Sequence, residues 1–240
     1  MEKDQRHEII ENLDQYRIGI DDVFAFKCRE CGKCCRDRDD ILLNSRDVYN
    51  IATALNLTHE QVIEKYCEVY IGQDSRIPVV RLLPVGANKT CPLLKNNRCM
   101  VHSLKPTVCA LFPIGRIVAS EHAQENMGLG CPYEIQYIFN GATCGSLKRK
   151  QTVRKWLGNF NIPTDDQFFI KWNEAIFKII TIIQGYDKKD GVTDKTMQMI
   201  WGAIFQSLYI NYDIHKDFYP QFEDNISKTL SLFDRLNQIN

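Results

Sequence analysis

Ten cysteines give this sequence its most reactive chemistry, and four of them fall within eight residues. That cluster reads Cys28-Arg29-Glu30-Cys31-Gly32-Lys33-Cys34-Cys35. Two residues separate Cys28 from Cys31 and Cys31 from Cys34, so a tight loop can direct successive sulfurs to one centre. Gly32 gives the backbone freedom to turn, and Cys35 must project differently from Cys34. Free thiols rarely gather so densely without metal or redox chemistry, and we interpret the cluster as the heart of a metal site.

A second group of cysteines follows at wider spacing. Seven residues separate Cys91 from Cys99, and nine separate Cys99 from Cys109. The group lies on a predicted hairpin and on the turn after Lys105-Pro106. This spacing alone is a weak signal. Joined to the first group, however, the three thiols would complete all-sulfur tetrahedral coordination, which suits either zinc or an iron-sulfur cluster.

These residues resemble the YkgJ-type cysteine-cluster family, a zinc- or iron-chelating domain with a CxxCxxCC signature. The resemblance covers about residues 24–157 and also takes in Cys91-Pro92-Leu93-Leu94 and Phe112-Pro113. Family members tend to carry a later cysteine before a Thr-Val-x-x-Trp-Leu stretch, which here is residues 152–157. The metal ligands that the residues and the resemblance together imply are Cys28, Cys31, Cys34, Cys35, Cys91, Cys99, Cys109 and Cys144. The chain departs from the family at Val101-His102, where Tyr is common, and at Lys105 and Ala110, where Arg is common.

The remaining cysteines and the histidines are weaker candidates. Cys131 precedes a proline, as metal ligands often do, and is left open between a ligand and a nearby thiol. Cys67 stands alone in a predicted helix, and we expect it to be a packing residue. His102 could coordinate as a neutral imidazole, but we favour a supporting or surface role. We likewise favour a supporting or surface role for the scattered histidines His7, His59, His122 and His215.

The identity of the metal is left open by the cysteine count. Eight thiolates divide into two sets of four, which fits two zinc ions or two cubane clusters. The triplet C-x2-C-x2-C is closer to the run that wraps a [4Fe-4S] cluster than to the paired knuckles of common zinc folds. We therefore favour an iron-sulfur cluster slightly over zinc.

The sequence patterns around these cysteines predict an α+β fold that is predominantly helical. We expect a small, metal-organised N-terminal part with short strands, covered by a C-terminal helical layer. The predicted division is an N-terminal helix over 1–23, a cysteine-cluster metal-binding domain over 24–157 and a C-terminal helical region over 158–240.

Local patterns place the individual elements. Ser45 is a plausible N-cap for one helix, and Thr58 to Gln61 form a capping box for a second helix, whose apolar spacing continues to Tyr70. Short strands are expected near 41–43, 79–85 and 115–119, with a hairpin around 95–98. Apolar residues at steps of three and four predict helices around 153–157, 168–180, 193–212 and 219–236.

Composition limits the possible settings and partners. The 240 residues are 44% hydrophobic and 25% charged, and thirty basic residues balance thirty acidic ones. No global field therefore favours nucleic acid or a membrane surface. The most apolar run, 175–183, is far shorter than the about 20 residues of a membrane span. With no signal-like stretch among the first twenty residues, we expect a cytoplasmic protein whose thiols stay reduced.

Three functions are compatible with this sequence. The first is a metal-binding protein in a redox, sensing or metal-handling role. The second is an S-adenosylmethionine-dependent enzyme, because flagellin lysine methylases carry the same signature, although no GxGxxG loop is present. The third is a zinc-stabilised interaction module with a protein partner, for which the best surface is Lys148, Arg149, Lys150, Arg154 and Lys155. A run of this kind is usually the solvated face of a helix, and we predict no nucleic-acid binding.

Overall fold

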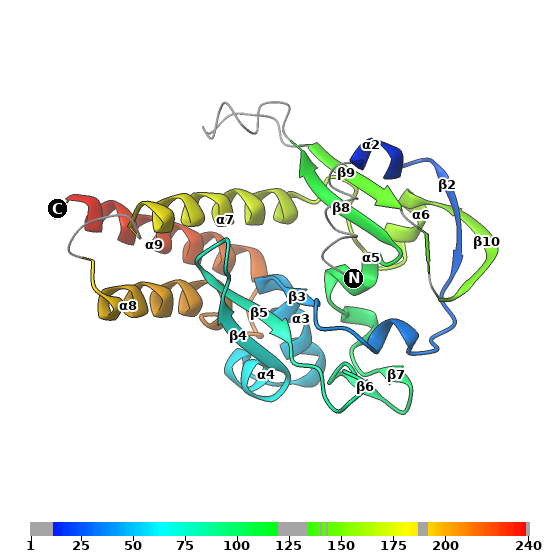
Figure 1. The fold of residues 1–240 in the computed structure, drawn as a ribbon, viewed down its shortest axis with the longest axis horizontal. Helices are drawn as coiled ribbons and strands as arrows, with labels where there is room; N and C mark the ends of the chain where they lie inside the picture. Colours follow the sequence, from blue (N-terminus) through cyan, green and yellow to red (C-terminus); the bar gives the residue numbers. More distant parts are fainter. Residues whose placement is uncertain (1–11, 120–133, 140, 143, 187–191, 239–240) are drawn as a thin grey trace.

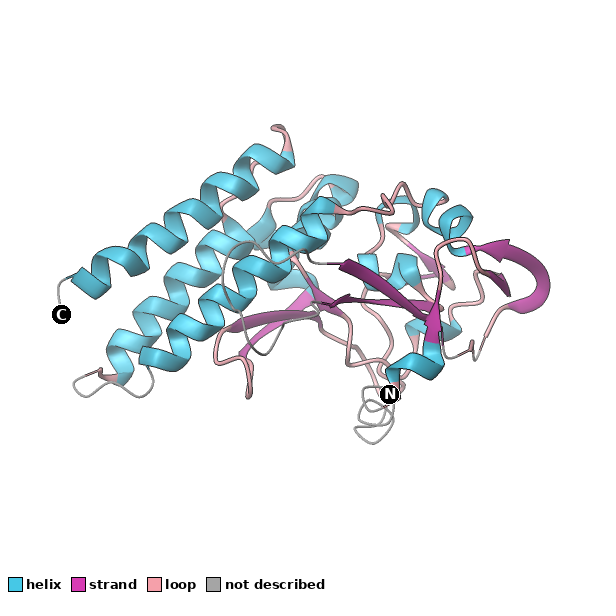
Figure 2. Ribbon diagram, turned by 90° about the horizontal axis from the view of Figure 1, so that it is seen from above, coloured by secondary structure: helices cyan, strands magenta, loops and turns pink. Residues whose placement is uncertain are grey.

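The computed structural model describes residues 12–119, 134–139, 141–142, 144–186 and 192–238. Three long helices lie together at one end of the molecule, and short strands and helices fill the other (Figures 1 and 2). The long helices are α7 (Gln167–Tyr186), α8 (Asp194–Phe205) and α9 (Phe218–Gln238), with a π-helical turn at Gln206–Ile210 after α8. The predicted α+β class with a C-terminal helical region is confirmed.

A three-stranded antiparallel sheet lies next to these helices. Its strand order is β3 (Leu42–Leu43), β5 (Pro78–Leu82) and β4 (Cys67–Ile71). Helices α3 (Ser45–Leu55) and α4 (His59–Tyr66) pack beside it. The sheet thus joins strands from residues 42–82 to helices formed by the last third of the chain.

The opposite end is built from small antiparallel pairs and short helices. One sheet has the order β1 (Arg17–Ile18), β9 (Glu134–Phe139) and β8 (Ile114–Ala119), while β2 (Val23–Lys27) pairs with β10 (Ser146–Thr152). A hairpin pairs β6 (Leu94–Lys95) with β7 (Arg98–Cys99), as predicted. The short helices are α2 (Leu13–Tyr16), α5 (Thr107–Leu111), α6 (Val153–Gly158) and the 3-10 turns Lys33–Cys35 and His102–Leu104.

Two helix boundaries differ from expectation. The N-cap of α3 is Asn44 rather than Ser45, because the Asn44 side chain accepts from the backbone N–H of Asp47 at 2.8 Å. The Thr58 capping box is confirmed, but α4 ends at Tyr66 and does not continue to Tyr70. Residues Cys67–Ile71 form β4 instead, since Val, Tyr and Ile favour strands and β5 offers a partner along all five residues.

Two further expectations change near the ends of the cysteine region. The helix expected over 1–23 is present among the described residues only as Leu13–Tyr16, and strand β1 follows at once. The basic residues 148–150 lie on strand β10 rather than on a helix, although they are exposed as expected. These residues adopt a strand conformation because β10 pairs with β2.

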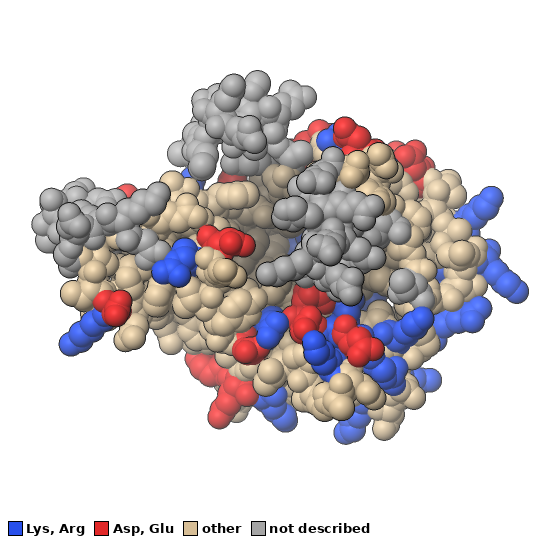
Figure 3. All heavy atoms as spheres, in the orientation of Figure 1, with Lys and Arg blue, Asp and Glu red and all other residues tan. Residues whose placement is uncertain are grey.

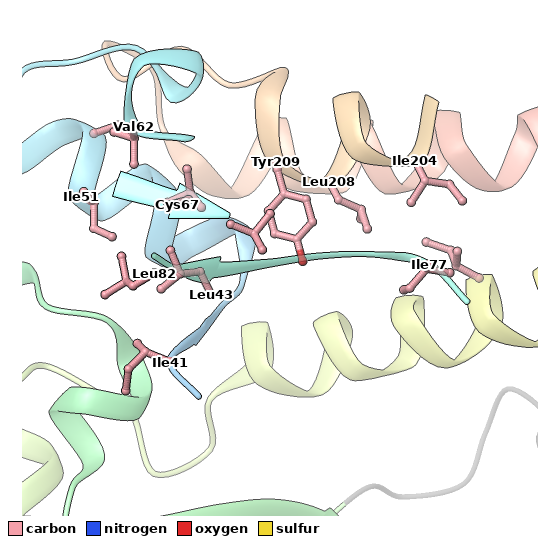
Figure 4. Packing of buried hydrophobic residues seen from close by; sticks show 14 of the residues in the cluster. Ile41, Leu43, Ile51, Val62, Cys67, Ile77, Leu82, Ile204, Leu208 and Tyr209 are labelled. Atoms are coloured by element: carbon pink, nitrogen blue, oxygen red, sulfur yellow. The ribbon is translucent and has the colours of Figure 1, made fainter. Parts of the chain in front are cut away.

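The core consists of two main clusters and one small aromatic one. The largest combines residues 41–101 with residues 179–233, and Figure 4 shows Cys67 inside it beside Val62 and Leu82. The second joins β2, α5, β8, β9 and α6, and it contains Phe24, Phe26 and Trp156. The domain boundary at 157 and 158 stays a prediction, but the largest cluster contains side chains from both sides of it.

The helices differ in length and in apolar character. Within the part of the chain that the structure describes, none combines the length and the apolar character that a membrane span requires.

Candidate metal centre

One cavity of about 260 Å³ lies at the strand-rich end of the molecule, and all eight cysteines predicted as ligands line it. They come from three segments that are far apart in the sequence. The lining thiols are Cys28, Cys31, Cys34, Cys35, Cys91, Cys99, Cys109 and Cys144. Among the described residues, helices α7, α8 and α9 contribute no side chain to the lining of this cavity.

The first segment is a tight loop that follows β2. Glu30 has φ 51° and Gly32 has φ 66°, so the chain turns twice before the 3-10 turn Lys33–Cys35. A Cβ on Gly32 would lie 3.1 Å from an Arg36 guanidinium nitrogen and would strain the left-handed backbone. The predicted role of Gly32 as the turning residue is confirmed.

The second segment is the β6–β7 hairpin with the residues around it. The backbone N–H of Cys91 donates to the carbonyl of Cys35 at 2.8 Å and joins the two cysteine segments directly. Asn96 and Asn97 both have positive φ, 51° and 61°, which is typical of a type I′ hairpin turn. The hairpin therefore brings Cys99 back beside the first loop.

Three thiols accept a hydrogen bond from the backbone N–H two residues further along. The N–H of Glu30 donates to the Cys28 sulfur at 3.4 Å. Burial raises the pKa of Cys91, and the N–H of Leu93 opposes that rise. Burial likewise raises the pKa of Cys99, and the N–H of Val101 opposes it. Such N–H donors favour the thiolate, which is the form that binds metal.

Cys109 lies on the short helix α5, whose start is held by Asp47 from α3. One Asp47 carboxylate oxygen accepts from the backbone N–H of Thr107 at 2.8 Å and from its hydroxyl at 2.7 Å. Asp47 is only 2% exposed. Burial raises its pKa, and the bonds from Thr107 and from the Asn44 N–H oppose the rise. Asp47 thereby fixes the element that carries Cys109.

Cys144 reaches the cavity through a close approach of two strands. Gly145 has φ 81°, and a Cβ there would lie 2.5 Å from a Phe26 ring carbon and 2.8 Å from the Lys27 carbonyl oxygen. Only glycine fits between β2 and the start of β10. Burial raises the pKa of the Cys144 thiol to about 11, and the neighbouring thiols Cys34, Cys31 and Cys28 add to the rise.

Aromatic side chains form one wall of the cavity. Phe26, Phe112 and Trp156 line it, with ring centroids of Phe26 5.8 Å from Phe112 and 5.4 Å from Trp156. The Trp156 indole N–H donates to the carbonyl of Leu111 at 2.9 Å, which ties α6 to α5. The thiols therefore face an apolar wall that limits the access of water.

Two cations, Lys105 and Arg38, place positive charge near the Cys34 thiol. The pKa of Cys34 is lowered to about 6, first because Cys35 hydrogen-bonds to its sulfur, 4.0 Å away, while Lys105 and Arg38 add positive charge against the effect of burial. The pKa of Cys35 is raised, first by its hydrogen bond with Cys34 and then by partial burial. Arg38 and Lys105 both line the cavity.

The remaining cysteines and histidines differ in their position relative to the cavity. Cys67 does not line the cavity and packs in the main core, where burial raises its pKa to about 12. It begins β4 rather than lying in a helix. His102 is exposed and lines the cavity. His59 is buried in the helical part, whereas Cys131, His7 and His122 lie outside the described residues.

Three contributors were not predicted as site residues. Arg38 lies outside the CxxCxxCC signature, and its role depends on the fold of the loop. Asp47 accepts a hydrogen bond from Thr107, which lies 60 positions away in the chain. Trp156 donates to the carbonyl of Leu111, which lies 45 positions away. The Thr-Val-x-x-Trp-Leu stretch was the one available signal for Trp156.

The donor set fits a metal that prefers sulfur. Cys thiolates suit zinc and iron-sulfur clusters, whereas calcium and magnesium prefer oxygen. Among the described residues, no group of three or more Cys, His, Asp or Glu side chains is arranged to hold one metal ion. The eight thiols therefore surround a cavity without converging on one point, and their role as ligands stays a prediction.

Comparisons with known proteins agree with this chemistry. Residues 27–132 match the family model described as "CxxCxxCC: Putative zinc- or iron-chelating domain". No curated protein and no solved structure matches the chain.

Proposed function

We propose that this protein holds iron-sulfur clusters through its eight cysteines, a proposal supported by the match of residues 27–132 to the model of a zinc- or iron-chelating domain. The clusters serve electron transfer, sensing or metal handling. The observation that carries the proposal is the meeting of all eight thiols at one cavity. When bound, such clusters supply one-electron redox chemistry.

The size of the cavity favours a multi-atom group. A water molecule needs about 10–15 Å³ of such space, whereas this cavity measures about 260 Å³. A single zinc ion would require four donors that converge closely, at about 2.3 Å from the metal. An arrangement of thiols around a larger space supports clusters over a single ion.

The residues around the thiols suit a redox centre. The backbone N–H groups of Glu30, Leu93 and Val101 stabilise negative charge on the sulfurs that accept from them, those of Cys28, Cys91 and Cys99. Arg38 and Lys105 add positive charge, and the aromatic wall lowers the local dielectric. Hydrogen bonds to sulfur, net charge and solvent exposure are the features that set the reduction potential of a cluster.

Anaerobic purification tests the identity of the metal. We expect a brown protein with broad absorption near about 400 nm that contains iron and acid-labile sulfide. Reduction with dithionite should bleach the absorption and produce a paramagnetic signal. A colourless protein with about two zinc ions per chain and no iron would contradict the proposal.

A matched pair of cysteine variants tests the ligands. Cys34→Ala removes a thiol that lines the cavity and should lower the iron and sulfide content strongly. Cys67→Ala removes a buried thiol outside the cavity and should leave metal content unchanged. Equal metal loss in both variants would show that the effect arises from general destabilisation.

A further inference from the structure

The segments that carry the thiols are strongly basic. Residues 24–36, 91–109 and 144–157 contain twelve Lys and Arg residues and one acidic residue, Glu30. The whole chain has thirty residues of each sign. The remainder of the molecule is therefore acidic, and in Figure 3 most of the blue side chains lie on the half that carries the cavity.

Six exposed cations define what we call the basic rim. They lie on β2, on the loop after it, on the β6–β7 hairpin and on β10. Among the described residues, none of the six has an ion-pair partner. The basic rim consists of Lys27, Arg29, Lys95, Arg98, Lys148 and Lys150.

The hairpin holds two of these cations in an unfavourable position. Lys95 and Arg98 are register partners across β6 and β7, so their side chains share one face of a two-stranded hairpin. Like charges directly opposite each other destabilise a strand pair. No acidic side chain in the described part of the chain forms an ion pair with either one. The pair points to an anionic surface outside this chain.

The rim is not needed as a counter-charge for the thiols. Arg38 and Lys105 already act on Cys34, and both are less exposed than the rim residues. Two rim residues, Arg29 and Arg98, also line the cavity, whereas the other four do not, and salt screens such exposed cations from the interior. Their main effect is on the approach of a charged partner.

We propose that the basic rim docks an acidic electron-carrier protein, an inference that rests on the proposed redox function. The exposed thiols Cys28 and Cys31 lie among the rim residues, which brings the centre close to a docked protein. One electron leaves the carrier, which is oxidised, and enters the centre, which is reduced. RNA is a poorer fit, because Phe26 and Trp156 beside the cavity are buried and offer no stacking surface.

Reduced flavodoxin is a suitable acidic carrier for the test. Its binding to the isolated holoprotein is measured by fluorescence anisotropy, and electron transfer by stopped-flow absorption. Both should weaken steeply between about 50 mM and about 500 mM salt, because steering depends on unscreened charge. The triple variant Lys95→Glu, Lys148→Glu, Lys150→Glu should bind at least about tenfold more weakly at low salt.

Single variants separate docking from folding. Lys95→Glu places opposite charges across the hairpin, so its melting temperature should not fall while flavodoxin binding weakens. The control is Lys195→Glu, an exposed lysine near the start of α8 at the far end of the molecule (Figure 1). It should bind flavodoxin as the unaltered protein does.

Three results would overturn the docking proposal. They are flavodoxin binding that ignores the charge reversals, equal weakening by Lys195→Glu, and charge-sensitive binding to polyuridine RNA or anionic vesicles but not to flavodoxin. Failure of the redox function is distinguishable, because a colourless zinc protein would still report binding by anisotropy but would accept no electron.

Discussion

Gly145 shows how a single residue without chemistry of its own positions a predicted ligand. Its φ is 81°, and a Cβ at this position would lie only 2.5 Å from a Phe26 ring carbon, so there is no room for a side chain. We expect Gly145→Ala to lower the free energy of unfolding by at least about 1–2 kcal/mol. It should also reduce metal content through displacement of Cys144.

The control for Gly145 is another glycine with open space around it. Gly202 lies exposed within α8, and a Cβ there meets nothing within 4 Å. Gly202→Ala should raise the free energy of unfolding by about 0.5–1 kcal/mol, because alanine favours the helix. Denaturant unfolding of both variants checks the opposite signs. Equal effects would show that backbone conformation at Gly145 is unimportant.

His59 predicts a pH dependence that is independent of the thiols. The ring is fully buried, its Nδ1 lies 2.7 Å from the Tyr209 carbonyl, and it stacks on Tyr212. Burial lowers its pKa in the folded state below the about 6.5 of the unfolded chain. The unfolded state therefore binds the proton more readily, and this part of the stability falls as pH decreases below about 6.5.

Comparison with His59→Phe isolates that effect. Both proteins keep the same metal centre, so the difference between their unfolding free energies reports the histidine alone. The advantage of the unaltered protein should shrink on acidification, by at most about 1.4 kcal/mol per pH unit. A difference that stays constant from pH 7 to pH 5 would contradict a neutral buried His59.

At the scale of elements, Asp47 links α3 to α5. It completes the capping box with Asn44 and accepts two bonds from Thr107, two residues before Cys109. Asp47→Ala leaves buried donors without an acceptor and should cost about 2–3 kcal/mol of unfolding free energy. It should also weaken metal retention, because α5 loses its anchor.

An exposed aspartate supplies the comparison for Asp47. Within the described chain, Asp224 on α9 pairs with Lys228 one turn away and with no other cation, and both side chains are largely exposed. Asp224→Ala should cost no more than about 0.5 kcal/mol and leave metal content unchanged. Thermal unfolding and metal analysis on both variants test the link. Full metal retention in Asp47→Ala would show that Cys109 does not depend on the position of α5.

At the scale of the whole molecule, the metal should organise only one end. Residues 27–40 contribute no side chain to the core clusters among the described residues, so we expect this loop to depend on bound metal for its order. The sheet β3–β5–β4 and helices α7–α9 share a large apolar core, which we expect to hold without metal. Binding free energy at a metal site is folding free energy for the segments that supply the ligands.

Hydrogen exchange before and after metal removal tests this division. Under reducing conditions, chelation should raise exchange across 27–40 and the β6–β7 hairpin while α7 and α9 stay protected. Loss of protection throughout the molecule would show that the metal holds the entire fold. Unchanged exchange at 27–40 would show that the loop is held by the protein alone.

The sequence by itself determined the features that depend on neighbours in the chain. The Thr58 capping box, the Asn-Asn hairpin and the amphipathic helices follow from spacing, because their stabilising contacts lie within a few residues. The cysteine spacing and the family signature likewise identified every thiol that lines the cavity. Their ligation of metal stays a prediction.

Only the tertiary structure decided the features that depend on distant partners. Residues 67–71 have helical spacing but form β4, because β5 provides hydrogen bonds that no local pattern reveals. Arg38, Asp47 and Trp156 reach the cavity or its supports through contacts between separate segments. The C-terminal helices cover the β3–β5–β4 sheet and contribute no described residue to the cavity lining, since burial of apolar faces determines where helices pack.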